Sequence, residues 1–507
     1  MMSAPQSAQL QSALPREPFI SKSKYLWGLQ CPKLLWHAYN AKHLLPPPDA
    51  QQQAIFDQGQ QVGGLAKRLF PDGLEVGEGV TDLDETIRLT RQALTLRRPL
   101  FEAAFAAEGG YARADILVPV GSDAWKLIEV KSTTSVKPIH LRDLAFQTYV
   151  LSQAGLDLRG CSVLHLNAAY VRHGPLDLRG LFVNTETTAR VLNLCRGVEE
   201  ELSAMSRTIR WPACPEVQIG PQCDEPYPCP LRDQCWAFFP EQNVVDLYRG
   251  AKKGFKLLAE GVTDLRDIPA GVKLTARQEI QKQAAATTQP HVEARALTRF
   301  LGQLNYPLHF LDFETFATAL PLFDGLRPFE QVPFQFSLHI VRAPGAVPEP
   351  FGFLADGTSD PRPEFMRRLT ERIGEEGSIV AFNADFEQGR LRECVRVLPR
   401  YASWLAGVEP RFVDLLRPFR DFHYYHPRQR GSGSMKRVLP ALTGGGYEHL
   451  AIQEGNTASL EFLRVTFTDA SDDERERVRR QLKAYCALDT EGMIWIVEAL
   501  RALVANP

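Results

Sequence analysis

The sequence predicts an α/β protein of two domains joined by a small helical connector, and three observations support this prediction. A chain of 507 residues is too long for one ordinary hydrophobic core. Its 44% hydrophobic and 23% charged residues supply enough apolar material for substantial cores and exclude a wholly disordered chain. Strand-like and helix-like segments follow one another in both halves, separated by a polar helical stretch.

The first domain is expected over residues 19–243, after a short disordered tail of residues 1–18 that lacks the features of a secretory signal. It contains the strand-like segments YARADILV and WKLIEVK, a helical stretch from Leu141 to Ala154, and the alternating SVLHLNAAYV. This order of elements is typical of an α/β layer.

The connector is expected over residues 244–305, where glycine and proline punctuate a helical pattern, as in KLLAEGVTDLRDIPAGVKL. The second domain, residues 306–507, begins with the strand-like HFLDFE and continues through FQFSLHIV and IVAFN. It ends in a long helical run from Asp472 to Val504. These elements again predict an α/β domain.

Composition also bears on location and partners. No apolar stretch approaches the roughly 20 residues that a membrane-spanning helix requires, so we expect a cytoplasmic protein without a membrane partner. The formal net charge of -2 gives no global sign of a polyanionic partner.

One segment departs from that balance. Between Arg390 and Arg437, the sequence contains eleven Lys and Arg residues but only four Asp and Glu residues. The aromatic residues interleaved with them are Phe419, Phe422, Tyr424 and Tyr425. Such a pattern indicates either a surface that follows a nucleic-acid backbone and stacks bases, or a solvated loop.

The first candidate site lies in the first domain, where Asp115 belongs to one predicted strand and Glu129 and Lys131 to the next. Side chains alternate along a strand, so Glu129 and Lys131 share a face, and a hairpin partner would bring Asp115 beside them. A divalent cation between two carboxylates removes their repulsion, and the lysine would orient the attacking water and stabilise charge on a phosphate.

This pattern resembles the PD-(D/E)XK nucleases of the RecB and CRISPR-associated type, whose restriction-endonuclease-like fold would cover residues 19–239. The resemblance implies catalytic roles for Asp115, Glu129, Lys131 and Gln147, with Tyr149 at a spacing of Gln-x-Tyr in place of the usual Gln-x-x-x-Tyr. Glycines stand where that group often has a histidine, in GQQVGGLAKRLF. Glu102 is therefore the expected third acid. A surface hairpin with an ordinary Glu/Lys pair is the alternative.

Nine cysteines in a reducing compartment are not expected to form disulfides. Five stand singly among apolar neighbours and are expected to be core or inert thiols: Cys161, Cys195, Cys214, Cys394 and Cys486. The other four are Cys31 in GLQCPKLLW and Cys223, Cys229 and Cys235 in PQCDEPYPCPLRDQCW, where five residues separate each cysteine from the next.

These four cysteines resemble the iron-sulfur staple of the RecB-type nucleases, in which one cysteine at the start of the domain joins three at its end. The resemblance implies a structural 4Fe-4S cluster that ties the two ends of the fold together. Four thiolates suit zinc equally well, so zinc is the alternative cofactor. A third reading is that the cysteines bind nothing.

The second candidate site lies in the second domain. Asp312 and Glu314 in HFLDFET share one face of a strand, and Tyr485 and Asp489 lie one turn apart on a helix. Glu387 in FNADFEQ is the remaining acid, with Asp385 as its alternative. Four such acids can hold two divalent ions, Mg²⁺ or Mn²⁺, about 4 Å apart for phosphodiester hydrolysis.

The three motifs resemble those of the DEDD exonucleases of the ribonuclease H-like fold, in the subgroup that has a tyrosine in the last motif. Asp312 and Glu314 match the first motif, Asn383 to Glu387 matches the second with Glu in place of Asp, and Tyr485-x-x-x-Asp489 matches the third. The resemblance implies 3′ to 5′ polarity and a tyrosine that positions the attacking water. Chance occurrence of three structural motifs is the alternative.

The two halves together also resemble an uncharacterised bacterial family in which a RecB-like nuclease precedes a domain with the LDFET signature. We therefore expect a metal-dependent DNA nuclease with two phosphodiesterase sites, acting on single-stranded DNA or DNA ends in repair, recombination or defence. One alternative is an RNA exonuclease with only the C-terminal site active. The other is a non-catalytic nucleic-acid-binding adaptor.

Overall fold

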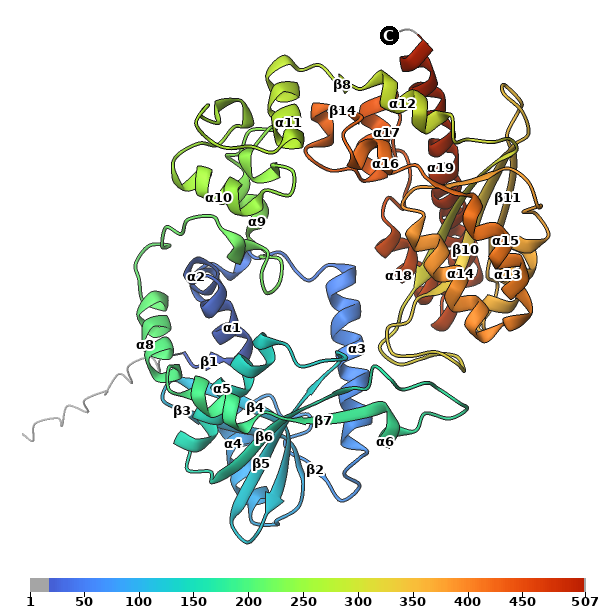
Figure 1. The fold of residues 1–507 in the computed structure, drawn as a ribbon. Coiled ribbons are helices and arrows are strands. Elements are labelled where there is room, and N and C mark those ends of the chain that lie inside the picture. Colours follow the sequence, from blue (N-terminus) through green and yellow to red (C-terminus); the bar gives the residue numbers. More distant parts are fainter. Residues whose placement is uncertain (1–17, 506–507) are drawn as a thin grey trace, which may run out of the picture.

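The structure is a computed structural model that describes residues 18–505, and it is a mixed α/β protein (Figure 1). Almost all of the expected N-terminal tail lies outside these residues. Within them, no helix combines the length and the apolar character that crossing a bilayer requires. The chain forms an N-terminal unit (residues 18–239), a connector (240–293) and a C-terminal unit (294–505).

The N-terminal unit is built on a seven-stranded sheet in the order β2-β3-β4-β5-β6-β7, with β1 paired parallel to β4. Its strands are β1 (Ile20–Ser21), β2 (Leu74–Glu75), β3 (Leu100–Ala107), β4 (Gly110–Val120), β5 (Ala124–Lys131), β6 (Leu158–Leu166) and β7 (Phe182–Glu186). β4 and β5 form the expected antiparallel hairpin, and β6 pairs parallel to β5.

Helices cover both faces of this sheet, since two separate clusters of buried side chains include strand residues. The helices are α1 (Lys22–Gln30), α2 (Pro32–Asn40), α3 (Ala50–Lys67), α4 (Leu83–Leu94), α5 (Pro138–Gln153), α6 (Leu178–Leu181), α7 (Thr188–Cys195), α8 (Val198–Ile209) and α9 (Arg232–Trp236). α3 begins at an N-cap, Asp49, whose carboxylate accepts from the Gln52 amide at 2.7 Å and so satisfies a free helix-end donor.

The C-terminal unit is built on a five-stranded sheet in the order β11-β10-β9-β12-β13. The strands are β9 (Leu308–Phe316), β10 (Val332–Val341), β11 (Glu349–Leu354), β12 (Ser378–Ala381) and β13 (Phe412–Asp414). β9, β10 and β11 are antiparallel neighbours, whereas β12 runs parallel to β9 and β13. Every residue of β10 is buried, as expected for a strand covered on both faces.

The helices of this unit are α12 (Ala294–Leu301), α13 (Arg362–Thr370), α14 (Asp385–Val397), α15 (Ala402–Val408), α16 (Arg417–Arg420), α17 (Met435–Thr443), α18 (Gly455–Phe467) and α19 (Asp472–Ala505). α19 is the long C-terminal helix expected from the sequence, and it packs on β9 and β10. α12 was expected in the connector, but Leu297 and Phe300 join the same buried core as α19.

The connector contains α10 (Ala251–Ala259), α11 (Ala276–Thr287) and β8 (His291–Val292), which pairs with β14 (Tyr424–Tyr425). It is tied to the C-terminal unit by ion pairs of Arg430 with Asp246, at 2.8 Å, and of Arg277 with Asp421, at 2.9 Å. Its own small core, around Val244, Leu257 and Leu265, is separate from those of the two units.

A second connection joins the two units on the side away from the connector. Residues 318–326, here called the clasp, lie against the N-terminal unit. Arg172 Nη1 donates to the carbonyl oxygens of Pro321 and Leu322 at 2.8 and 2.7 Å. The Ala319 amide donates to Gln58 on α3 at 2.9 Å, and Ala319 is buried in the N-terminal core.

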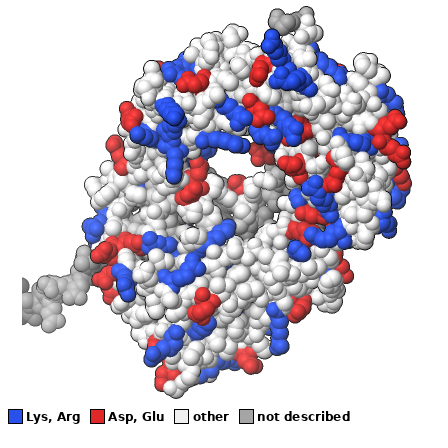
Figure 2. Space-filling model, viewed as in Figure 1, with Lys and Arg blue, Asp and Glu red and all other residues white. Residues whose placement is uncertain are grey.

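The chain therefore forms a closed ring (Figure 1). The connector closes one side, and the clasp together with the contact between α3 and α18 closes the other. Figure 2 shows that side chains do not fill the space inside the ring, which remains an opening through the molecule.

Candidate functional site

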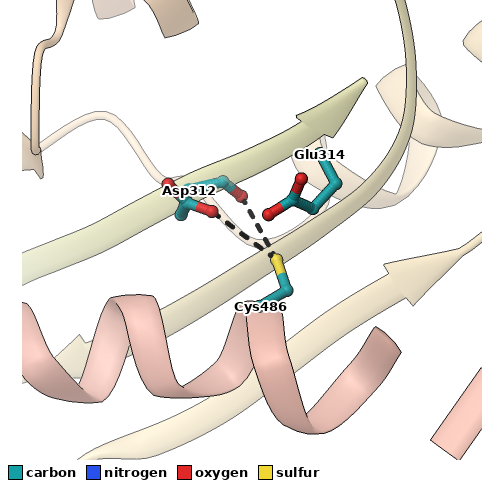
Figure 3. A group of neighbouring side chains, drawn as sticks. All are labelled: Asp312, Glu314 and Cys486. Atoms are coloured by element: carbon teal, nitrogen blue, oxygen red, sulfur yellow. Dashed lines mark hydrogen bonds between the residues drawn. The ribbon is translucent and has the colours of Figure 1, made fainter. Parts of the chain in front are cut away.

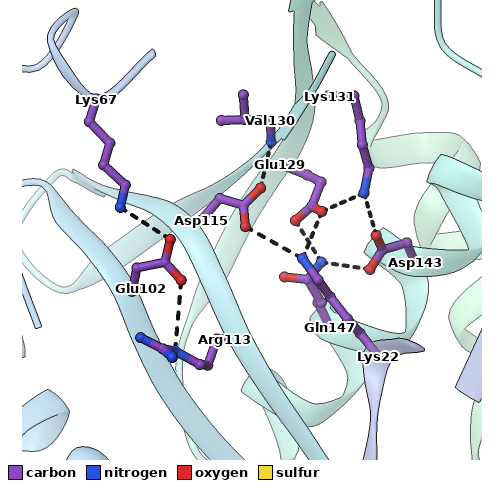
Figure 4. Close-up of polar contacts among 10 residues, drawn as sticks. All are labelled: Lys22, Lys67, Glu102, Arg113, Asp115, Glu129, Val130, Lys131, Asp143 and Gln147. Atoms are coloured by element: carbon purple, nitrogen blue, oxygen red, sulfur yellow. Dashed lines mark hydrogen bonds and ion pairs between the residues drawn. The ribbon is translucent and has the colours of Figure 1, made fainter. Parts of the chain in front are cut away.

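The first cluster of charged side chains lies where β4, β5 and α5 meet (Figure 4). Asp115 accepts a hydrogen bond from the Val130 amide at 2.8 Å. Lys131 Nζ lies 2.7 Å from Glu129 Oε1, so the two side chains share a face as expected. Gln147 on α5 donates to the other Glu129 oxygen at 2.7 Å. The structure thus brings together the four residues that the sequence singled out.

Two further residues belong to this cluster and were not expected. Lys22, at the start of α1, places Nζ 2.9 Å from Glu129 Oε1 and 3.4 Å from Asp115 Oδ1. Asp143 accepts from Lys131 at 2.7 Å and from Gln147 at 2.8 Å. Asp143 precedes Gln147 by one helical turn, a spacing that could have revealed it. Lys22 is far away in sequence, and no local pattern signals its position.

Burial and neighbouring charges shift the pKa values of the two central acids, Asp115 and Glu129, in opposite directions. Burial, followed by the Glu129 charge, raises the pKa of Asp115 to about 7. Burial acts on Glu129 in the same direction, but Lys131 and Lys22 outweigh it and hold the pKa of Glu129 below its usual range. A divalent cation bound between these carboxylates would therefore displace Lys22 and any proton on Asp115.

Glu102 and Tyr149, which the sequence also suggested for this site, do not join the central acids. Glu102 lines the same pocket, but its carboxylate is paired with Lys67 at 3.1 Å and Arg113 at 3.7 Å instead of joining the central acids. Tyr149 packs against the apolar core on the α5 side, so the Gln-x-Tyr spacing turns it away from the pocket.

The wall opposite the acids is one face of α3. A pocket of about 670 Å³ lies between them, lined by Lys22, Glu102, Asp115, Glu129, Lys131 and residues of α3. That helix contributes Gly59, Gly63 and Gly64, and a methyl group added at any of the three would meet nothing within 4 Å. Ile55 and Phe56 on the same wall are 56% and 53% exposed. This wall is therefore smooth and open.

These glycines weaken α3, which gives a testable consequence. Replacing Gly59, Gly63 and Gly64 together by alanine is expected to raise the free energy of unfolding by about 2 kcal/mol, because each removes about 0.5–1 kcal/mol of backbone entropy loss without a clash. Chemical denaturation would measure it. Gly28→Ala in α1 is the matched control, since its new methyl group would lie 2.7 Å from Met205. Unchanged stability of the triple variant would contradict the open-wall geometry.

The second cluster contains all five residues that the sequence singled out in the C-terminal half. β9 carries Asp312 and Glu314, α14 carries Glu387, and α19 carries Tyr485 and Asp489. All five line one pocket of about 580 Å³. The alternative acid, Asp385, is exposed and lies outside the lining of this pocket. Glu387 is therefore the acid that the second motif contributes.

Three neighbours complete this pocket. Tyr447 donates a hydrogen bond to Asp489, and the Lys436 ammonium lies 5.7 Å from the centre of the Tyr485 ring. Cys486 Sγ, buried beneath the acids, lies 3.7 Å from Asp312 Oδ2 (Figure 3). Cys486 was expected among apolar neighbours, but it touches a carboxylate because it follows Tyr485 on the inner side of α19. Asp312, Glu314 and Cys486 place ligand atoms within 4.8 Å of one another.

Burial raises the pKa of all four acids in this pocket, and repulsion between the carboxylates adds to it for Asp312, Glu314 and Glu387. The pKa reaches about 8 for Glu314 and Glu387 and about 6 for Asp489, in each case mainly because of burial. Burial, then Asp489 and Glu314, raise the pKa of Asp312 as well. Lys436 lowers the pKa of Glu314 and Asp489 without offsetting burial. Uncompensated acids at this density fit a site for divalent cations.

The raised pKa values predict how stability depends on pH without metal. A carboxyl whose pKa is higher in the folded than in the unfolded state stabilises the protein below pH about 4.5, and this contribution is lost as pH rises towards about 8. In EDTA, the free energy of unfolding should therefore fall more steeply between pH about 4.5 and about 8 for the wild type than for Glu314→Gln. The Glu314 carboxyl accounts for a difference in slope of up to about 1.4 kcal/mol per pH unit. Denaturant titrations at several pH values measure the difference, and parallel curves would contradict it.

The four cysteines singled out by spacing also converge. Cys31 lies between α1 and α2, while Cys223, Cys229 and Cys235 lie in and before α9, and all four line one small pocket. The Cys229 amide donates to the Cys223 carbonyl at 2.8 Å. Gln30 donates to the carbonyl oxygens of Gln222 and Tyr227 at 2.8 and 2.7 Å, which holds the two ends of the unit together.

Burial affects two of these thiols, and it raises the pKa of Cys31. Burial, and more weakly the neighbouring thiols, raise the pKa of Cys229 to about 11. Among residues 18–505, the cysteines contribute no trio of sulfur atoms within 4.8 Å of one another. Thiolates on one tetrahedral zinc would stand about 3.8 Å apart, given Zn–S bonds of about 2.3 Å. In this arrangement, no three of the four sulfurs are as close together as the ligands of one zinc ion would be.

Of the five cysteines expected to be inert, Cys161 and Cys394 are buried as expected. Cys195 is partly buried and donates to the Ala145 carbonyl at 3.4 Å. Cys214 is partly buried, and its sulfur lies 3.6 Å from His37 Nδ1.

The prediction of a surface between Arg390 and Arg437 on which bases stack is wrong. Its four aromatic side chains are at most 3% exposed. Phe419 and Tyr424 belong to the core of the C-terminal unit, and Phe422 and Tyr425 to a small cluster shared with the connector. Phe422 stacks on Tyr425 with ring centres 4.6 Å apart and meets Tyr248 of the connector. Several of the arginines form ion pairs, such as Arg390 with Glu393 at 2.7 Å. The segment is mainly a structural joint.

Comparison with known proteins gives a partial match. Residues 309–434 match a family described as a domain of unknown function, DUF2779. An uncharacterized protein of Mycoplasma genitalium, MG366, is 24% identical over 217 residues, which cover 38% of this chain and 32% of that protein. Its homolog in Mycoplasma pneumoniae is 24% identical over 220 residues, with 39% and 32% covered. The chain thus spans about a third of the length of these relatives. No solved structure matches it significantly.

Proposed function

We propose that the protein is a metal-dependent nuclease with a 3′ to 5′ exonuclease site in its C-terminal unit and a second phosphodiesterase site in its N-terminal unit. The single observation that carries the proposal is the convergence of Asp312, Glu314, Glu387 and Asp489 in one pocket with Tyr485. Binding of nucleic acid alone would not require four buried acids without matching cations. Their chemistry fits divalent cations that hold a phosphodiester for hydrolysis.

In the C-terminal pocket, the four carboxylates would hold Mg²⁺ or Mn²⁺, which supplies an activated water and stabilises the leaving oxygen. Tyr485 places its hydroxyl in this pocket and would orient that water. Tyr447 holds Asp489 in place through its hydrogen bond. Lys436 and Arg249, both in the pocket lining, would meet the charge of the phosphate.

In the N-terminal pocket, Asp115 and Glu129 would hold the cation, and Gln147 fixes Glu129 through a hydrogen bond of 2.7 Å. Lys131 would stabilise charge on the phosphate and orient the water. Lys22, released from the carboxylates, would be a second positive group for the same phosphate. By resemblance, this unit is a PD-(D/E)XK fold and the C-terminal unit is a ribonuclease H-like fold.

We further propose that the four cysteines hold a structural 4Fe-4S cluster. Their thiols line one small pocket, and no three of the four sulfurs lie within 4.8 Å of one another. The cluster would tie Cys31 to the end of the unit, and the thiols would lose their protons on binding.

A second candidate function keeps only the C-terminal site active, with RNA as the substrate. It is favoured by Lys22, which spans the two acids of the N-terminal pocket and competes with a cation there.

The test is a nuclease assay with purified protein, Mg²⁺ or Mn²⁺, and linear DNA or RNA strands labelled at one end. A strand labelled at its 3′ end should release the label as mononucleotides, whereas a strand labelled at its 5′ end should become progressively shorter. Asp312→Asn and Glu129→Gln, tested singly, identify which site produces each product, and the double variant is the inactive control. Activity that survives in the double variant, or the absence of activity in every metal and on every strand, would contradict the proposal.

A further inference from the structure

Helices that carry lining residues of the two pockets border the opening of the ring. α1 and α3, which border the N-terminal pocket, lie on one side of the opening, and α17 and α18 lie on the other (Figure 1). Figure 2 shows this opening passing through the molecule. The C-terminal pocket also includes Tyr248 and Arg249 of the connector, so its mouth lies where the connector meets the C-terminal unit.

Two helices that contact each other, α3 and α18, connect the regions of the two pockets. The glycine face of α3 belongs to the N-terminal pocket, and α3 contacts α18. α18 contributes Gly455, Asn456 and Ser459 to a further pocket that also contains Glu314 and Lys436. The contact between α3 and α18 therefore links an element of the Glu129 pocket to an element of the pocket that contains Glu314.

The chemistry of the two pockets and of α3 fits an extended polyanion that carries planar groups. Besides their acids, the two end pockets include six cationic side chains: Lys22, Lys67, Lys131, Arg249, Arg420 and Lys436. The three lysines of the N-terminal pocket are paired with its carboxylates. Exposed or half-exposed aromatic rings, Phe56 at one end and Tyr248 and Phe386 at the other, can stack on bases. The three glycines of α3 leave room for a backbone to approach closely.

We propose that a single nucleic-acid strand enters the ring by a free end and threads through the opening, so that one strand is presented to both pockets. This inference rests on the proposed function and adds the route by which one strand reaches both sites. A closed circle of the same sequence cannot pass through a closed ring. The clasp is the point at which the ring would have to open to admit a strand sideways.

The test is a binding experiment that needs no cleavage. The double variant Glu129→Gln/Asp312→Asn is incubated with a linear DNA strand biotinylated at both ends, streptavidin is then added, and salt is raised to dissociate contacts that depend on charge. The threaded strand should remain bound and dissociate at least ~10-fold more slowly than the same sequence ligated into a circle. Equal release of both would overturn threading while leaving the nuclease proposal intact. Failure to bind either strand would overturn both.

A second variant tests the route through the clasp. Arg172→Ala/Asp324→Ala removes the hydrogen bonds of Arg172 to Pro321 and Leu322 and that of Asp324 with the Gly174 amide. Release of the end-blocked linear strand should become at least ~5-fold faster, because the ring can now open. Arg159→Ala is the matched control, since its 69% exposed side chain pairs with Asp157 at 2.9 Å and makes none of the hydrogen bonds described for the clasp. If the end-blocked strand is released equally slowly from Arg172→Ala/Asp324→Ala and from Arg159→Ala, the clasp is not the point at which the ring opens, and the proposed route is overturned.

Discussion

Replacing Asp312 with asparagine is expected to slow nucleotide release from the 3′ end by about a thousandfold or more, which corresponds to about 4 kcal/mol of lost transition-state stabilisation. Asp312 lines the C-terminal pocket, and the charges of Asp489, Glu314 and Glu387, after burial, raise its pKa. Asparagine keeps the shape of the side chain but removes the charge that binds a cation. Release of a 3′ label under single-turnover conditions measures the loss.

The same variant should be more stable than the wild type when metal is absent, because one buried acid no longer repels three others. Activity and stability would then move in opposite directions, which a variant that merely misfolds would not do. Asp385→Asn is the control, since that side chain is exposed and outside the pocket. An Asp312→Asn protein that retains its exonuclease rate would exclude this pocket as the site of cleavage.

Replacing Cys229 with serine is expected to remove the visible absorbance of an iron-sulfur cluster and to lower the free energy of unfolding by about 4 kcal/mol. The four thiols connect Cys31 with a segment almost two hundred residues later in the chain. Losing the link restores the freedom of this long loop in the unfolded state. Iron and sulfide analysis, absorbance and denaturation of protein purified without oxygen would measure the effect.

Cys214→Ser is the matched control for the cysteine experiment. Cys214 is also partly buried and lies near His37, but it is not part of the pocket that the other four line. Its variant should keep both colour and stability. Colourless wild-type protein that contains zinc would replace the cluster with the alternative metal, and metal-free protein of unchanged stability would leave the cysteines without a bound group.

The main elements of the fold could be predicted because their signals are local. Alternation identified β4, β5 and β9, and the long periodic run at the C-terminus identified α19. The acids of both pockets were found because each belongs to a short motif on a regular element. Their convergence could be expected only by resemblance, since spacing within one strand does not say which distant helix packs over it.

Features that depend on distant packing could not be predicted. Lys22 reaches Glu129 because β1 pairs with β4, and a strand of two residues leaves no pattern in the sequence. Phe422 and Tyr425 looked like exposed stacking residues because charged residues surround them, yet the connector covers them. Burial is a property of the assembled chain, and local composition reports it poorly at such joints.

The clasp has a consequence for how the chain can be divided. Ala319 is encoded in the C-terminal half but completes the apolar core of the first sheet, next to Val62 and Ala66 of α3. During synthesis, that surface of α3 stays uncovered until residue 326 has emerged, long after its own sheet can form. A protein cut in the connector would leave this patch exposed on one fragment and its cover on the other. The two halves are therefore folding partners, and neither is a freely detachable module.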